Sequence, residues 1–138
     1  MAQGCLKNFN FLADDGLVDT LLMEVADLLE NFLAHGRPGS IDLAGLPLSA
    51  SCLAALEHRL GHGEISAIIR VSGESETRET AFPGVWWTSH ADETGRIIAM
   101  LIEVTDVPDI LRAGKADMAR GQIRLQAATS FAQARRTA

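Results

Sequence analysis

The chain opens with a long segment in which apolar residues recur at steps of three and four positions. This period places them on one side of an α-helix, so the pattern predicts a long helix over residues 14–35. Asp14 or Asp15 can cap its start, and Gly36 is typical of its end. We expect residues 1–13 to form an N-terminal tether. The apolar stripe consists of Leu17, Val18, Leu21, Leu22, Val25, Leu28, Leu29, Phe32 and Leu33.

A second, shorter helix is predicted after a stretch rich in glycine and proline. Residues 41–49 (IDLAGLPLS) form either a brief strand or an ordered loop. Ser49 is a suitable N-cap for the helix, and Gly61 is suited to its end. The side chains that this helix turns inward are Leu53, Leu56 and Leu60.

The apolar period changes to two from residue 63 onward, which is typical of β-strands. Residues 64–71 (EISAIIRV) form the first strand. A second strand is expected over residues 77–82, and it continues over residues 85–89. Pro83 and Gly84 lie between these two stretches and predict a bulge or a kink, because proline cannot donate to a ladder and glycine tolerates unusual backbone angles.

A third strand, over residues 96–104, is apolar on nearly both sides, so we expect it at the centre of the sheet. Short turns join the strands, which favours an antiparallel meander. Pro108 begins a final helical region, in which Gly114 and Gly121 predict a short helix and a longer one.

The order of these elements predicts an α+β fold, in which helices pack on one face of a three- or four-stranded antiparallel meander. We expect a single domain over residues 1–138, with residues 129–138 as a frayed tail.

Composition narrows the classes of partner. The net charge is −6, which disfavours nucleic acid. No apolar run reaches the roughly 18 residues of a membrane span, so no membrane insertion is expected. The N-terminus lacks the features of a secretory signal, which predicts a cytoplasmic protein. Charge is also uneven, since residues 14–57 contain eight acids, whereas residues 112–138 contain six bases and one acid.

No catalytic constellation emerges, and we predict no catalytic residue, no resident metal and no cofactor. Cys5 and Cys52 lack metal-ligand or redox spacing. His58 and His62 are four positions apart, but Gly61 has ended the helix between them. A metal- or cluster-handling role through these four side chains, or an enzyme of unknown reaction, remains an alternative. The possible acid–base groups Glu79, Glu103, His90 and Asp92 are spread over strands and turns.

Two adjacent tryptophans, Trp86 and Trp87, lie just after Phe-Pro-Gly. Side chains alternate along a strand, so the two rings point to opposite sides of the sheet. One ring can pack under the helices. The other is either covered within the monomer or exposed as the anchor of a partner surface. The apolar third strand also makes a homodimer an open alternative.

Four segments together resemble the HupH/HyaF hydrogenase expression proteins, and in particular their C-terminal unit. They read IDLAGLPLS, LEHRLGHGEISAII, ETAFPGVWWTSH and IEVTDVPDIL, they lie between residues 41 and 111 in that order, and the resemblance covers about residues 15–112. The stretches Leu60–Ala67 and Glu79–Trp86 are the most specific parts of this resemblance.

The resemblance implies an accessory or chaperone protein in maturation of a [NiFe] uptake hydrogenase. Its expected partner is a hydrogenase subunit precursor, in the first place the small, iron–sulfur-bearing subunit, or another maturation factor. We expect the kinked strand to form the partner-binding face, with a tryptophan ring as anchor and with Glu79 and Glu64 able to pair with basic residues. The predicted partner-binding residues are Glu79, Phe82, Pro83, Gly84, Val85, Trp86 and Trp87.

Overall fold

The computed structural model describes the backbone of residues 3–137 and the side chains of residues 15–137. The chain divides into two compact units, the first ending at Pro108 and the second beginning at Asp109. The one-domain organisation stays a prediction.

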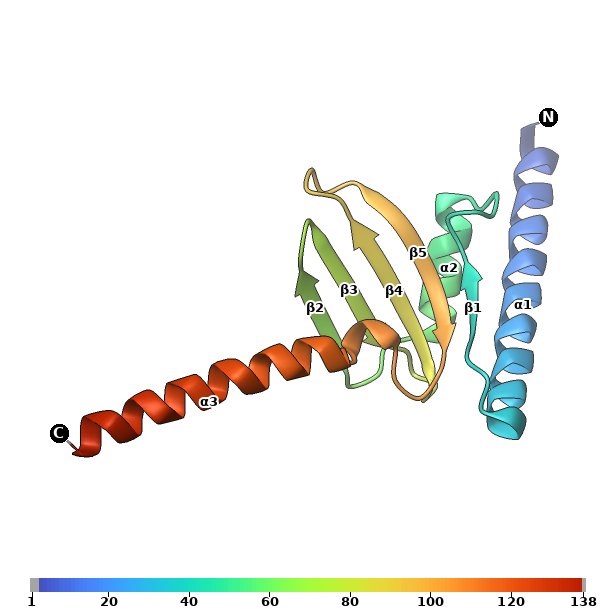
Figure 1. The fold of residues 1–138 in the computed structure, drawn as a ribbon. Coiled ribbons are helices and arrows are strands. Elements are labelled where there is room, and N and C mark those ends of the chain that lie inside the picture. The colour runs from blue at the N-terminus through green and yellow to red at the C-terminus, as the bar shows by residue number, and fades with distance from the viewer. Residues whose placement is uncertain (1–2, 138) are drawn as a thin grey trace. The chain divides into compact units, whose positions relative to one another are not determined.

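The first unit contains a five-stranded antiparallel sheet with the strand order β1-β5-β4-β3-β2 (Figure 1). Strands β2 to β5 form a meander, and β1 joins the far side of β5. The α+β class is therefore confirmed, while the predicted three or four strands fall short of five. The strands are β1 (Gly39–Asp42), β2 (Ser66–Arg70), β3 (Glu74–Glu79), β4 (Val85–Ala91) and β5 (Ile97–Val104).

The segment predicted as one kinked strand is two strands joined by a tight turn. Val85 N donates to Phe82 O at 3.0 Å, and Gly84 has a φ of 84°. Proline followed by a glycine with positive φ is the signature of a type II turn. The expected bulge or kink at Pro83 and Gly84 is therefore wrong, because the chain reverses its direction there.

The predicted central position of the third strand is also wrong. This strand is β5, which lies between β1 and β4, so β4 occupies the middle of the sheet. Strand β1 pairs with β5 in antiparallel register, for example Ile41 opposite Ile102. Local sequence patterns do not reveal a partner that lies about sixty residues away.

Helix α1 (Gln3–His35) begins well before the predicted start, so the proposed tether is helical from Gln3 onward. Gly16 does not stop this helix, since an interior glycine costs only about 1 kcal/mol. The predicted end is confirmed, because Gly36 has a φ of 67° and its N–H donates to Phe32 O at 2.7 Å.

Helix α2 (Ala50–Leu60) has both predicted ends. Cys52 N donates to Ser49 Oγ at 3.1 Å, and Gly61 N donates to Glu57 O at 3.0 Å.

One hydrophobic core joins α1 and α2 to the sheet. The β4–β5 register sets Trp87 opposite Ile102 and Val85 opposite Val104, so these four side chains share one face. Both helices pack on that face. The buried members of the core are Val18, Leu21 and Val25 of α1; Cys52, Leu56 and Leu60 of α2; and Ile41, Leu43, Val85, Trp87, Ile102 and Val104 of the strands and the loop after β1.

Both tryptophans are buried, on opposite sides of the sheet as alternation requires. Trp87 is 6% exposed and belongs to the core, whereas Trp86 is 3% exposed on the other face. The indole N–H of Trp86 donates to Thr105 O at 3.0 Å. The alternative in which one ring is exposed as a partner anchor is therefore wrong. Trp86 is buried, and Thr105, just after β5, provides the hydrogen-bond acceptor for its indole N–H.

The second unit contains a short 3-10 helix, η1 (Asp109–Leu111), and helix α3 (Lys115–Thr137). This confirms a short and a longer helix, although Gly121 lies inside α3 without breaking it. Helix α3 extends to Thr137, through most of the predicted frayed tail. No helix among the described residues is both long and apolar enough to cross a membrane.

The burial of Trp87 predicts that its replacement by alanine destabilises the fold. Truncating a buried aromatic ring costs about 3–5 kcal/mol, so Trp87→Ala lowers the free energy of unfolding by that amount in urea titration. Phe82→Ala is the matched control, because Phe82 is 50% exposed, and it should cost less than about 1 kcal/mol. Equal losses in the two variants would contradict this description of the core.

Candidate functional site

Helix α1 carries more apolar surface than the core covers. Val18, Leu21 and Val25 are at most 5% exposed and face the core. A second stripe runs beside them at positions 22, 26, 29 and 33, which are separated by four, three and four residues. Leu22 and Leu29 of this stripe are partly buried against the core, Ala26 is exposed, and Leu33 reaches 78% exposure. The exposed part of this second stripe is available to another molecule.

The second stripe lines an apolar groove between α1, the end of α2 and the β3–β4 turn. The enclosed part has a volume of about 240 Å³. Arg59 is its one charged lining residue, and its guanidinium lies 3.2 Å from Asp19 of α1. The lining residues are Leu22, Val25, Ala26 and Leu29 of α1; Arg59 and Leu60 of α2; and Phe82 and Val85.

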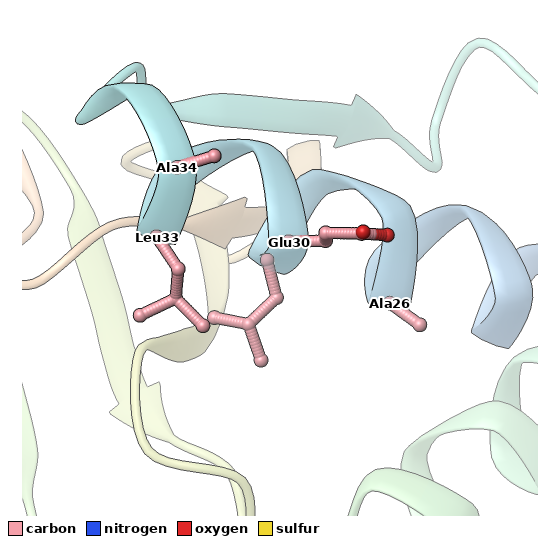
Figure 2. A pocket seen from close by; sticks show the side chains of 5 residues that line it. Ala26, Glu30, Leu33 and Ala34 are labelled. Atoms are coloured by element: carbon pink, nitrogen blue, oxygen red, sulfur yellow. The ribbon is translucent and has the colours of Figure 1, made fainter.

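A wider and more open depression continues the groove along α1. Its volume is about 540 Å³, and it shares Ala26 and Leu29 with the enclosed part. Figure 2 shows Leu33 and Ala26 projecting from the same helix on either side of Glu30. From Leu22 to Leu33 the combined groove follows α1 for about 16 Å, at about 1.5 Å per residue.

Backbone hydrogen bonds fix the turn that presents Phe82 to the groove. Ala81 N donates to Leu60 O at 2.9 Å, which ties the turn to the end of α2. Thr105 N donates to Gly84 O at 3.0 Å, which ties it to the residue after β5. Phe82 N donates in turn to Thr80 Oγ1 at 3.2 Å. The half-exposed Phe82 ring therefore stands on a rigid support.

Helix α1, which lines the groove, is rich in exposed carboxylates. Glu30 lines the open depression, and residues 15–35 hold five exposed carboxylates but no lysine or arginine. A bound segment with basic residues beside its apolar ones would meet complementary charge here. The five carboxylates are those of Asp15, Asp19, Glu24, Asp27 and Glu30.

The predicted partner-binding residues divide between three locations. Phe82 and Val85 line the groove, with Pro83 and Gly84 forming the turn between them. Trp87 is covered by the core. Glu79 pairs with Trp86 across the strands and lies with it on the opposite face of the sheet. The turn thus keeps its predicted place at the surface as a candidate for partner binding, whereas neither buried tryptophan can serve as an exposed anchor. Sequence reasoning also did not identify the contribution of α1.

A polar cluster around Arg78 fastens α2 to the sheet. The Arg78 side chain is 10% exposed, and its Nη2 lies 2.7 Å from Glu57 Oε1. Its Nη1 donates to Gly61 O at 3.2 Å and lies 3.1 Å from His62 Nδ1. The guanidinium carbon lies 5.6 Å from the ring centroid of Trp87, within cation–π range. Sequence reasoning missed this cluster because its members are up to 30 residues apart.

Of the candidate metal ligands, His58 and His62 line one depression together with Glu57. His62 contacts Arg78, His58 is exposed, and Cys52 is fully buried. The side chain of Cys5 lies outside the described residues. Within the part of the chain whose side chains are described, no group of three or more His, Cys, Asp or Glu residues is placed to hold a metal ion.

The polar groups expected to be spread apart lie closer than predicted. Glu79, Glu103 and His90 share the face of the sheet opposite the helices. The hydroxyl oxygens of Thr77 and Thr88 lie 2.8 Å apart, and Thr88 Oγ1 donates to Glu103 Oε2 at 2.8 Å. Both threonines are at most 1% exposed.

His90 and Asp92 also have hydrogen-bond partners. His90 Nδ1 lies 2.7 Å from Ser75 Oγ. Asp92 lies in the β4–β5 turn, where the hydrogen bond from the Thr94 hydroxyl holds the pKa of its carboxyl below the usual value. Side-chain hydrogen bonds within the fold thus involve Glu103, His90 and Asp92.

The family of the chain follows from comparison with known proteins. The family described as HupH hydrogenase expression protein, C-terminal conserved region, matches residues 18–132. The chain belongs to this family. The resemblance seen in the sequence is thereby confirmed, and the matched region includes the whole groove.

Two relatives illustrate the extent of the similarity. Hydrogenase expression/formation protein HoxQ of Azotobacter vinelandii is 30% identical over 108 residues, which cover 75% of this chain and 38% of the relative. Hydrogenase expression/formation protein HupH of Rhodobacter capsulatus is 31% identical over 114 residues, which cover 80% and 41%. The chain thus spans about two fifths of the length of these HupH-family relatives.

A solved structure shares the fold. It is that of hydrogenase expression protein HupH from Thiobacillus denitrificans, which is 37% identical with a TM-score of 0.82. The match covers 84% of this chain and 97% of that one.

The contacts of Arg78 predict a measurable role in stability. Arg78→Gln removes a charge-assisted bond to Glu57 and the contact with Trp87, and it should lower the free energy of unfolding by about 1–3 kcal/mol. Arg70→Gln is the control, since the Arg70 side chain is 73% exposed and pairs with Glu74 on its own hairpin. That change should cost about 0–1 kcal/mol. If Arg78→Gln lowers the free energy of unfolding no more than Arg70→Gln does, the result would contradict the role of Arg78 in holding α2 to the sheet.

Proposed function

We propose that this chain acts as an accessory protein in maturation of a [NiFe] uptake hydrogenase. It binds a hydrogenase subunit precursor, in the first place the small, iron–sulfur-bearing subunit, and it does so in the cytoplasm before assembly. Membership of the HupH family supports the pathway. The observation that carries the mode of action is the apolar groove with Phe82 at its edge.

The dimensions of the groove favour a polypeptide over a small molecule. Its enclosed part, about 240 Å³, is smaller than the roughly 300–1,000 Å³ of most small-molecule pockets. That space suits one or two side chains. The length of about 16 Å matches three turns of a helix, and an amphipathic helix in an apolar groove is a recurring mode of peptide recognition. We therefore propose a short apolar segment of the precursor as occupant.

The charge around the groove favours a segment with basic flanks. Glu30 lies within the open depression, and the other exposed carboxylates of α1 extend the negative surface. Exposed charges contribute little affinity but increase the encounter rate and set the orientation of the bound segment. Phe82 and the leucines of the second stripe supply the binding energy through burial.

The same geometry supports a chaperone action without bond-breaking chemistry. An unassembled subunit exposes apolar segments that its partner will later cover, and such segments promote aggregation. Covering one of them in the groove keeps the precursor available for assembly. This action needs a rigid concave surface, which the bonded turn and the two helices provide.

Replacing Phe82 tests the proposed anchor. Phe82→Ala should weaken binding of the purified small-subunit precursor at least tenfold in calorimetry or co-purification, which corresponds to a hot-spot loss of about 1.4 kcal/mol or more. Leu33→Asp should weaken binding similarly, because it places a charge in the apolar depression. Unfolding by urea should remain close to that of the unmodified chain.

Met23→Asp is the matched control for Leu33→Asp. Met23 is a 67% exposed aliphatic residue of the same helix, and it lies outside both parts of the groove. Normal binding by this control, with losses in the other two variants, supports the groove. Unchanged binding of Phe82→Ala and Leu33→Asp would refute it. Binding of the large-subunit precursor in place of the small one would correct the choice of subunit only.

A further inference from the structure

Strand β2 is an unprotected edge of the sheet. The order β1-β5-β4-β3-β2 leaves the outer side of β2 without a neighbouring strand among the described residues. The other edge, β1, has only four residues and contacts α1. Around β2 the side chains of Ile65, Ile68 and Val71 are 51%, 52% and 76% exposed. Natural edges usually carry lysine, proline or a cover, and residues 65–71 contain neither lysine nor proline.

The backbone of β2 is oriented for pairing on its outer side. Glu79 N donates to Ile65 O at 2.8 Å, so the odd-numbered residues turn their backbone groups toward β3. Because these groups alternate along an antiparallel strand, Ser66, Ile68 and Arg70 direct theirs away from the sheet. Three residues thus offer both an N–H and a C=O to an added strand.

The sequence of this edge is complementary to itself. Glu64 precedes the strand and Arg70 ends it, and both side chains are exposed. Two copies paired antiparallel about Ala67 would set each Glu64 opposite Arg70 of the other copy. The same register brings Ser66 opposite Ile68, whose backbone groups both point outward, and Ile65 opposite Ile69. Opposite charges facing each other across a strand pair stabilise it.

We infer that two copies of this chain associate through β2 into a continuous ten-stranded antiparallel sheet. This association is independent of the proposed function, because β2 contributes no lining residue to the apolar groove. It uses a different strand from the homodimer predicted through the apolar third strand, because β5 has strand neighbours on both sides within one chain.

Sedimentation equilibrium of the full chain, from about 1 μM to 1 mM, tests the association. We expect a reversible dimer whose dissociation constant rises at least tenfold in Ile68→Pro. Proline removes the outward N–H of residue 68, while the ladder with β3 uses the odd-numbered residues and stays intact. Ile98→Lys is a control, because Ile98 is 56% exposed on an inner strand, and it should dimerise normally.

A charge exchange tests the antiparallel register independently of folding. Glu64→Arg and Arg70→Glu each place like charges opposite one another twice in the dimer, and each should weaken self-association about tenfold. Mixing the two variants restores opposite charges at both ends, so the mixture should form a heterodimer with the original affinity.

A chain that stays monomeric up to about 1 mM would overturn the inference. A dimer that is unaffected by Ile68→Pro, or two charge variants that do not rescue each other on mixing, would overturn it equally.

Discussion

The apolar surface of α1 is wider than the sheet and α2 can cover, and the rest of the structure follows from this excess. One stripe of the helix, at Val18, Leu21 and Val25, closes the core over β4 and β5. The neighbouring stripe, from Leu22 to Leu33, borders the β3–β4 turn and the end of α2 and is only partly covered. Burial of apolar area is the main stabilising force in folding. Covering the exposed side chains of this stripe with a partner would therefore contribute favourable free energy to binding. The turn adds Phe82 and closes one side of the groove.

The local part of this structure could be predicted from the sequence. Helix ends at Gly36, Ser49 and Gly61 depend on neighbouring residues alone, and all three are confirmed. The family was also evident from short segments. The irregular segment at Pro83 and Gly84 was also located, because Phe-Pro-Gly next to tryptophan is a local pattern. Its conformation was not, since proline and glycine suit both a bulge and a type II turn.

The non-local part could not be predicted, and the reasons are physical. Whether a tryptophan is exposed depends on what covers the second face of the sheet, and Trp86 is sealed by a hydrogen bond to Thr105, 19 residues away. The pairing of β1 with β5 and the contacts of Arg78 with α2 likewise join distant segments. The wide stripe of α1 was visible in the sequence, but the division between its buried and open parts depends on where the sheet ends.

The most direct test of the account is a map of the surface that contacts the hydrogenase small-subunit precursor, obtained from methyl NMR spectra of the chain labelled at isoleucine, leucine and valine. The account predicts that binding shifts or broadens the methyl signals of Leu22, Leu29 and Leu33 and leaves those of Ile97 and Ile98 unchanged. The opposite result, with changes confined to methyl groups outside the groove, would contradict the claim that the open stripe of α1 is where this protein binds its partner.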